Sequence, residues 1–253
     1  LIQVGQRQRA EAEIMGYGTV ETPEEAAALL RLADLGGLPR SAFKLGNLVA
    51  YGSLSGDVGG DVPIDAALYP IPPWQPEDGF KLDKALIYAL IRQESAYNPD
   101  AISGDGARGL MQIMPRTASY VGQGSRYHGS RRDELFEPGL NLSLGQRYLS
   151  YLLNYRGIDG DLFRLTTAYN GGPGNLNKWE QHIQAGDDPL LFIESLPSRE
   201  TRTFIERVLA NLWIYRQRLK QPSPSLDLIA AGDRPLYTSL DINGPEVAQY
   251  GQN

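Results

Sequence analysis

The sequence contains no cysteine and only two histidines. The lack of cysteine excludes disulfide bonds, thiolate metal ligands and cysteine nucleophiles. A histidine metal site or a Ser–His–Asp triad needs His128 or His182, which stand far apart with no ligand-like spacing around them. We therefore expect both histidines at the surface or at helix ends, and we predict no metal site.

Long apolar runs and an excess of positive charge are also missing. No run approaches the roughly 20 apolar residues that span a bilayer, so we predict no transmembrane segment. The formal net charge of −6 argues against a protein that neutralises nucleic-acid phosphates. The chain starts at Leu1 and shows no signal-peptide pattern, so we expect a processed or trimmed piece of a longer protein.

The first part of the chain shows helical patterns. Thr22-Pro23-Glu24-Glu25 is a capping-box pattern with proline at the first helical position, and Gly36-Gly37 ends the apolar spacing that follows. A second short helix is predicted around 42–49. The glycine-rich stretch 53–60 and the proline-rich stretch 69–74 cannot be helix interiors. We therefore place a domain boundary near 75–78.

Helical spacing of apolar residues continues over 81–219, and no stretch shows strand alternation. The apolar stripes contain Leu86, Ile87, Leu90 and Ile91; Leu142, Leu149 and Leu152; Leu162, Leu165 and Tyr169; and Ile205, Val208, Leu212, Tyr215 and Leu219. The sequence thus predicts an all-α protein in three parts. These are a helical segment at 1–77, a main domain at 78–222 and an extended tail at 223–253.

Glu94 is the candidate catalytic residue. It lies three residues after Ile91 and seven after Ile87, so on a helix it falls on the apolar stripe near the C-terminal end. Partial desolvation and the negative end of the helix dipole both favour its protonated form. Such an acid can protonate a glycosidic oxygen near neutral pH. By spacing alone, a buried glutamate held by hydrogen bonds for structure explains the position slightly better.

Other motifs follow Glu94 in a fixed order: Gly109-Leu110-Met111-Gln112, Ala168-Tyr169-Asn170 and Glu200-Thr201-Arg202. Glycines before Gln112 let the loop turn tightly and present backbone groups to a ligand. An amide and a phenol suit sugar rings. Taken singly, each has a structural explanation: the methionines and Tyr169 as packing residues, and Glu200 as part of a helix start.

Together these motifs resemble the soluble lytic transglycosylase family, whose catalytic domain has a goose-type lysozyme-like α fold. The resemblance runs from about Tyr69 to Leu219, and residues 1–50 are similar to the end of that family's α-superhelical linker domain. Glu94-Ser95 matches the catalytic Glu-Ser pair, and Glu200-Thr201-Arg202 matches the motif of the soluble branch. The family often has an aromatic residue where this chain has Ser198.

The resemblance implies that Glu94 acts first as acid and then as base. It would cleave the β-1,4 bond between N-acetylmuramic acid and N-acetylglucosamine and leave a 1,6-anhydromuramic end. Most glycosidases use two carboxylates, but no second one stands in a comparable motif near Glu94. By resemblance, the residues that position the sugar or Glu94 are Ser95, Ser103, Met111, Gln112, Met114, Tyr169, Asn170 and Glu200.

The resemblance also implies peptidoglycan glycan strands as the partner, no cofactor and a periplasmic location. The sequence does not identify protein partners. Two other functions stay open. One is a muramidase that adds water on the same fold, and the other is a peptidoglycan-binding module without catalysis.

Overall fold

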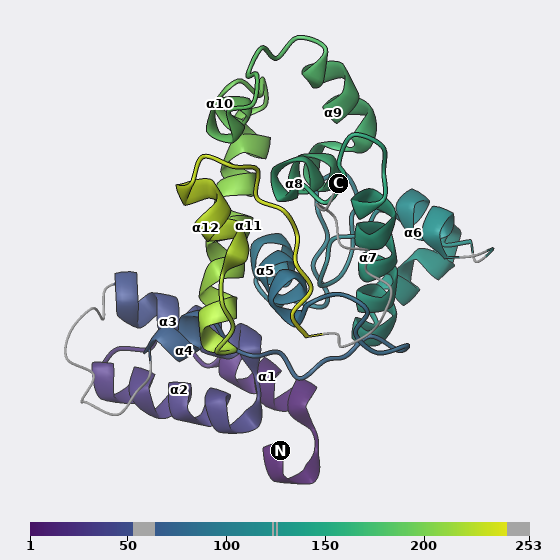
Figure 1. The fold of residues 1–253 in the computed structure, drawn as a ribbon. Helices are drawn as coiled ribbons and strands as arrows, with labels where there is room; N and C mark the ends of the chain where they lie inside the picture. Colours follow the sequence, from purple (N-terminus) through teal and green to yellow (C-terminus); the bar gives the residue numbers. More distant parts are fainter. Residues whose placement is uncertain (53–63, 123, 125, 242–253) are drawn as a thin grey trace. The chain divides into compact units, whose positions relative to one another are not determined.

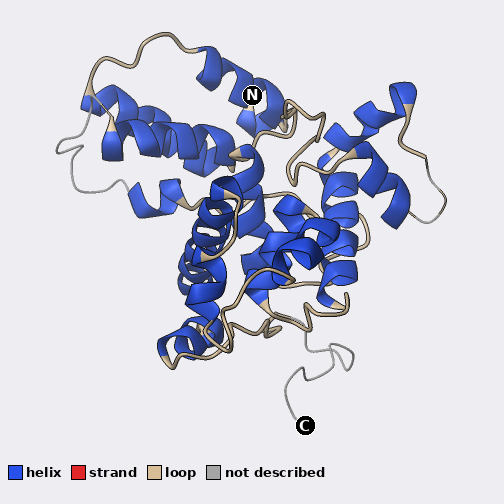
Figure 2. Cartoon of the chain, turned by 90° about the horizontal axis from the view of Figure 1, so that it is seen from above, coloured by secondary structure: helices blue, strands red, loops and turns tan. Residues whose placement is uncertain are grey.

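A computed structural model describes residues 1–52, 64–122, 124 and 126–241. The predicted glycine-rich loop at 53–60 lies outside the described residues. Helices make up the regular structure of the described part, and Figure 2 shows no strand there. Only isolated β-bridges occur in it, such as the one between Asp161 and Leu236. The predicted all-α fold is therefore confirmed.

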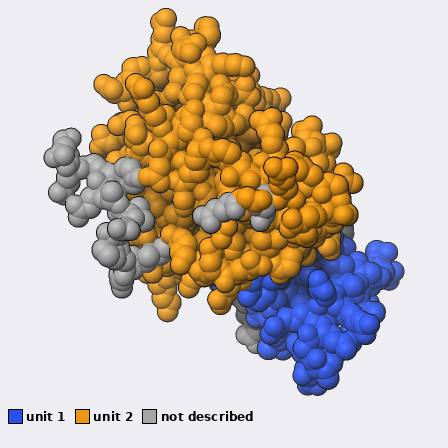
Figure 3. All heavy atoms as spheres, turned by 90° about the vertical axis from the view of Figure 1, so that its right-hand side faces the viewer, with its two compact units in different colours: residues 1–74, 96–98 blue, residues 75–95, 99–253 orange. Residues whose placement is uncertain are grey.

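The chain divides into two compact units, coloured separately in Figure 3. Unit 1 contains residues 1–74 and 96–98, and unit 2 contains residues 75–95 and 99–253. The division falls close to the boundary expected from the proline-rich stretch. It differs in placing the short segment 96–98 with unit 1, where the Tyr97 ring lies edge-on to Phe43 at 5.5 Å.

Unit 1 is a small helical unit. Its elements are η1 (Ile2–Val4), α1 (Arg7–Gly16), α2 (Pro23–Gly36), α3 (Pro39–Tyr51) and α4 (Ile64–Leu68). The predicted cap of α2 is present, since the Thr22 side chain accepts a hydrogen bond from the Glu25 N–H at 3.2 Å. Gly37 ends α2 with a φ of 59°, a left-handed conformation that glycine adopts without strain. Leu30, Ala33 and Leu45 form the centre of its core.

Unit 2 carries most of the helices (Figure 1). They are α5 (Lys84–Ser95), α6 (Pro115–Val121), η2 (Gly129–Phe136), α7 (Pro138–Leu153), α8 (Leu162–Gly171), α9 (Pro173–Glu180), α10 (Pro189–Glu194), α11 (Arg199–Arg218) and α12 (Pro224–Ala230). The apolar stripes predicted between 81 and 219 lie on these helices, except that Leu219 is the residue that follows α11. In the described residues, no helix has both the length and the apolar character needed to cross a bilayer.

Helix α5 is the centre of unit 2. All seven residues from Ala85 to Ile91 are buried, so the helix is apolar on every side rather than along one stripe. Its main neighbour is the long helix α11, which contributes Ile205, Val208 and Leu212 to the same core. Polar contacts add to this packing, because the Arg92 guanidinium donates to the Asn211 amide oxygen at 2.9 Å.

The segment that follows α12 is bound to unit 2. Residues 224–230 of the predicted extended tail form α12, and residues 233–241 run as an extended strap along the helices (Figure 1). Asp83, just before α5, accepts hydrogen bonds from the N–H groups of Leu240 and Asp241. Arg216, near the end of α11, donates to the Asp83 carboxylate at 2.9 Å and to the Thr238 carbonyl at 2.8 Å. This ion pair is buried, with both side chains at most 3% exposed.

Removing one partner of this ion pair tests its contribution to stability. We expect Arg216→Met to lower the free energy of unfolding by about 3 kcal/mol, because the Asp83 carboxylate stays buried without its counter-ion. Arg218→Met is the matched control, since Arg218 lies two residues further along α11 and is exposed. This substitution should change the free energy of unfolding by less than about 0.5 kcal/mol. Chemical denaturation measures both. Equal effects of the two substitutions would contradict this assignment.

Candidate active site

A pocket of about 520 Å³ opens on unit 2 at the C-terminal end of α5. Its walls come from three helices: α5, α8 and the first turns of α11. The lining residues are Gln93, Glu94, Asn170, Arg199, Glu200, Thr203, Phe204 and Arg207. The pocket therefore joins two motifs more than a hundred positions apart in the sequence, Glu94-Ser95 and Glu200-Thr201-Arg202.

Glu94 is an acid with an unusual pKa in this pocket. Burial, and to a smaller extent the negative charge of Glu200, raise the pKa of its carboxyl group from the ordinary 4.5 to about 8. Within the described residues, no side chain or backbone N–H donates a hydrogen bond that would stabilise the carboxylate. Glu94 is thus mostly protonated at neutral pH. The sequence predicted this direction and the desolvation, but not the contribution of Glu200.

Glu200 is the second carboxylate that the sequence did not reveal near Glu94. It lies exposed in the first turn of α11. The predicted helix start at this motif is confirmed. Ser198 caps α11 by accepting from the Thr201 N–H at 3.1 Å, which gives the serine at this position a structural function.

Helix α8 is fixed to α11 beside the pocket. The Thr201 hydroxyl donates to the Asn170 amide oxygen at 2.8 Å, so the Ala-Tyr-Asn motif and the Glu-Thr-Arg motif are in direct contact. One residue earlier, the Tyr169 ring stacks with Phe204 at 6.4 Å. Burial and the nearby Glu94 charge raise the pKa of the Tyr169 phenol well above its usual value, so it stays a neutral donor.

The Gly-Leu-Met-Gln loop is fixed by hydrogen bonds with a buried amide side chain. The Asn141 side chain donates to the carbonyls of Arg108 and Leu135 at 2.9 and 2.8 Å and accepts from the Met111 N–H at 2.8 Å. The Tyr169 hydroxyl donates to the Met111 carbonyl at 2.8 Å. Gly109 has a φ of 75°, and a Cβ there would lie 2.3 Å from the Leu135 carbonyl oxygen. No sequence pattern indicated this role of Asn141.

The structure brings three of the predicted site residues together in the pocket, namely Glu94, Asn170 and Glu200. Their roles toward a ligand stay predictions. Five others that line the pocket were missed, and one of them, Arg199, directly precedes Glu200. Thr203, Phe204 and Arg207 follow Glu200 at helical spacing, so a predicted helix starting at Ser198 could have indicated them. Gln93 directly precedes Glu94.

The other predicted residues lie behind the pocket or beside it. Ser95 is buried and its hydroxyl donates to the Ile91 carbonyl at 3.1 Å. Ser103 accepts from the Ala107 N–H at 3.0 Å, and the Gln112 amide donates to the Ala101 and Gly109 carbonyls. Met111 is fully buried against Gly145, and Met114 is 37% exposed at the start of α6. In this structure these side chains build the scaffold of the site, and any contact with sugar stays a prediction.

Metal ligands do not gather around this pocket. Across the described ranges, no group of three or more His, Asp or Glu side chains is placed to hold a metal ion. His128 is at the N-terminal end of η2, and the His182 ring nitrogen Nδ1 lies 2.9 Å from the Lys178 carbonyl oxygen. The carboxyl groups that line the pocket are those of Glu94, whose pKa is raised, and of the exposed Glu200.

The sequence is similar to those of known peptidoglycan-cleaving enzymes. Residues 74–192 match the family model of the Transglycosylase SLT domain. Soluble lytic murein transglycosylase from Escherichia coli K12 is 37% identical over 139 residues, which is 54% of this chain and 21% of that protein. A putative soluble lytic murein transglycosylase from Haemophilus influenzae is 30% identical over 145 residues, which is 57% of this chain and 24% of that protein. The chain spans about a fifth to a quarter of these relatives.

Solved structures give the same result. The crystal structure of the 70 kDa soluble lytic transglycosylase from Escherichia coli matches with a TM-score of 0.69 and 28% identity. The match covers 87% of this chain and 35% of that one. The complex of the 70 kDa soluble lytic transglycosylase with bulgecin A matches with a TM-score of 0.68 and 27% identity, over 94% of this chain and 36% of that one.

Fold and site together define a lysozyme-like all-α domain with one protonated glutamic acid in a surface pocket. The match of residues 74–192 and the similarity to these relatives and structures support the soluble lytic transglycosylase family, which the motifs predicted. The matched domain model ends at residue 192, before α11. Glu200 is therefore contributed by a helix outside the matched range.

Gly109 tests how tightly the loop is fixed. We expect Gly109→Ala to lower the free energy of unfolding by about 3 kcal/mol, since a Cβ both clashes with backbone and is strained at positive φ. Gly106→Ala is the control, because its φ of 88° is equally strained but no atom lies within 4 Å of the added carbon. It should cost only about 1 kcal/mol. Similar losses by denaturation would contradict the close approach of Gly109 to Leu135.

The charge of Glu200 should affect the titration of Glu94. We expect Glu200→Gln to lower the pKa of Glu94 from about 8, because it removes a like charge, while burial keeps the value above 4.5. Glu206→Gln removes an exposed charge of the same helix that does not line the pocket, and it should leave the titration unchanged. Carbon-13 NMR of glutamate-labelled protein measures both. An unchanged Glu94 titration in Glu200→Gln would contradict the coupling.

Proposed function

We propose that the protein is a peptidoglycan lytic transglycosylase that cleaves the β-1,4 bond between N-acetylmuramic acid and N-acetylglucosamine. The observation that carries the proposal is the Glu94 carboxyl group, with a pKa of about 8, in a pocket walled by the family's motifs. A general acid works best when its pKa lies near the operating pH. Similarity to the soluble lytic transglycosylase family supports the choice of substrate.

In this mechanism Glu94 acts twice. Its carboxyl group first donates a proton to the glycosidic oxygen, so the bond to the anomeric carbon breaks and the N-acetylglucosamine end leaves as an alcohol. The Glu94 carboxylate then accepts the proton of the muramic C6 hydroxyl, whose oxygen bonds to C1 and closes the 1,6-anhydro ring. Glu94 recovers its proton and no water is consumed. In this family the substrate's own N-acetyl group stabilises the positive charge at C1.

A muramidase on the same fold is the second candidate, and the position of Glu200 favours it. Hydrolysing glycosidases commonly use an acid and a second carboxylate that activates water or attacks the sugar. Glu200 lines the same pocket as Glu94, so such a pair exists here. The first candidate is preferred because Glu200 belongs to the Glu-Thr-Arg motif of the transglycosylases of the soluble branch.

The mass of the reaction products distinguishes a transglycosylase from a muramidase. We expect wild-type protein incubated with purified peptidoglycan to release muropeptides one water lighter than those of a lysozyme, as measured by mass spectrometry. Glu94→Gln should fold normally and lose activity by at least about 10³-fold, since an amide cannot donate the proton. Glu206→Gln should keep activity near that of wild type.

Other outcomes decide against the proposal. Hydrated products that depend on Glu94 identify a muramidase. A folded wild-type protein that binds peptidoglycan without releasing products is a non-catalytic module. Near-normal turnover by folded Glu94→Gln excludes Glu94 as the acid.

We also propose that the protein acts on glycan strands in the periplasm. The support for this location is the family itself. Cell fractionation with antibody detection tests it, and recovery of the protein with cytoplasmic markers would contradict it.

A further inference from the structure

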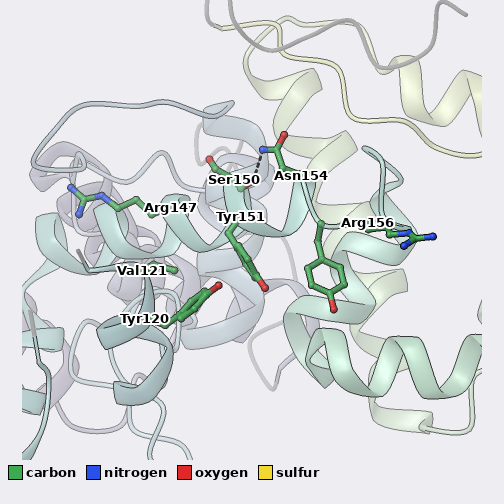
Figure 4. A pocket seen from close by; sticks show the side chains of 8 residues that line it. Tyr120, Val121, Arg147, Ser150, Tyr151, Asn154 and Arg156 are labelled. Carbon is green, nitrogen blue, oxygen red and sulfur yellow. Dashed lines mark hydrogen bonds between the residues drawn. The ribbon is translucent and has the colours of Figure 1, made fainter. Parts of the chain in front are cut away.

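A second surface depression, of about 750 Å³, lies on unit 2 outside the Glu94 pocket (Figure 4). It is formed by the end of α6, the C-terminal half of α7 and the turn after α7. The two hollows share no lining residue. Nothing in the proposed mechanism uses this second depression.

The depression is rich in tyrosine. The Tyr120 ring is edge-on to the Tyr151 ring, with 5.2 Å between the ring centroids. The Tyr151 ring is in turn edge-on to Tyr155, with 5.8 Å between the centroids. Tyr120 is 67% exposed, which leaves a large aromatic face open to a ligand. A hydrogen bond with Tyr120 raises the pKa of the Tyr151 phenol, and the Asn177 amide donates to the Tyr155 hydroxyl at 3.1 Å. These bonds hold the rings in place before any ligand arrives.

Two arginines lie at opposite ends of the depression, with Tyr120 and Tyr151 between them in Figure 4. Arg147 pairs with Asp78 at 3.3 Å. Arg156 is exposed, and no acidic side chain of the described residues pairs with it. In a chain of net charge −6, a free guanidinium beside open aromatic rings favours a ligand that has both apolar ring faces and carboxylates.

A row of packed aromatic rings connects this depression with the Glu94 pocket. Tyr151 stacks on Tyr148 at 6.2 Å, Tyr148 contacts Tyr169 at 5.6 Å, and Tyr169 stacks on Phe204 at 6.4 Å. Phe204 lines the Glu94 pocket. Three ring-to-ring contacts thus connect the two hollows, which places them on the same part of unit 2.

We infer that the depression is a second binding site for acidic β-1,4 glycan strands. The open tyrosine faces pack on sugar rings, and Arg156 pairs with carboxylates that the strand carries. The identity of the polymer as peptidoglycan rests on the proposed function. A linear polymer held at two hollows dissociates more slowly than one held at the Glu94 pocket alone.

Binding measured without turnover tests this inference. In the full chain carrying Glu94→Gln, we would add Tyr120→Ala or Arg156→Gln and titrate with two probes by calorimetry. The probes are soluble peptidoglycan strands with peptide stems and neutral N-acetylglucosamine oligomers. Tyr120→Ala should weaken both about three- to tenfold, because both have sugar rings to pack. Arg156→Gln should weaken only the acidic strands, about three- to fivefold and less at high salt.

Arg218→Gln is the matched control, because it removes an exposed arginine away from both hollows, and it should change neither affinity. Circular dichroism confirms that each variant is folded. If both variants bind both probes within twofold of their parent while wild type releases anhydro products, the second site is excluded and the proposed function stands. If wild type releases none but the binding losses appear, the site stands and the proposed function fails. An equal loss of neutral oligomers in Arg156→Gln excludes carboxylate pairing.

Discussion

The burial of α5 against α11 is the constraint on which the rest of unit 2 depends. A helix that is apolar on every side from Ala85 to Ile91 must lie inside the core, and its last turn then carries Glu94 out of water. The antiparallel partner α11 brings Glu200 to the same end. Burial and like charge together keep the Glu94 proton in place at neutral pH. One packing arrangement thus supplies the acid and the pocket around it.

The same two helices are fastened at their opposite ends. Asp83 precedes α5 and Arg216 lies near the end of α11, so their buried ion pair closes the helix pair far from Glu94. The strap at 233–241 adds hydrogen bonds to both side chains. An acid held in an unfavourable environment costs folding free energy, and these contacts offset part of that cost. Residues 233–241 therefore help to hold the helix pair that positions the acid.

The long helices and the position of Glu94 could be predicted, because apolar spacing and caps such as Thr22 are local signals. The sequence did not predict the short helices α6, α9, α10 and α12. Each of them has too few turns for a periodic pattern and begins at a proline that also fits a loop. Glu200 was predicted only through a motif, and its repulsion of Glu94 depends on the α5–α11 packing. Asn141 gave no signal, because a buried amide is recognised only by the carbonyls around it.

The central claim is that folding raises the pKa of Glu94, and stability measured against pH tests it directly. A carboxyl group with a folded pKa near 8 and an unfolded pKa near 4.5 adds stability that is complete below pH 4.5 and lost as pH rises to 8. The Glu94→Gln variant lacks this pH-dependent contribution to the free energy of unfolding. We predict that the free energy of unfolding of wild type falls relative to Glu94→Gln between about pH 4.5 and 8 and stays level above. A constant difference across this range would contradict the account.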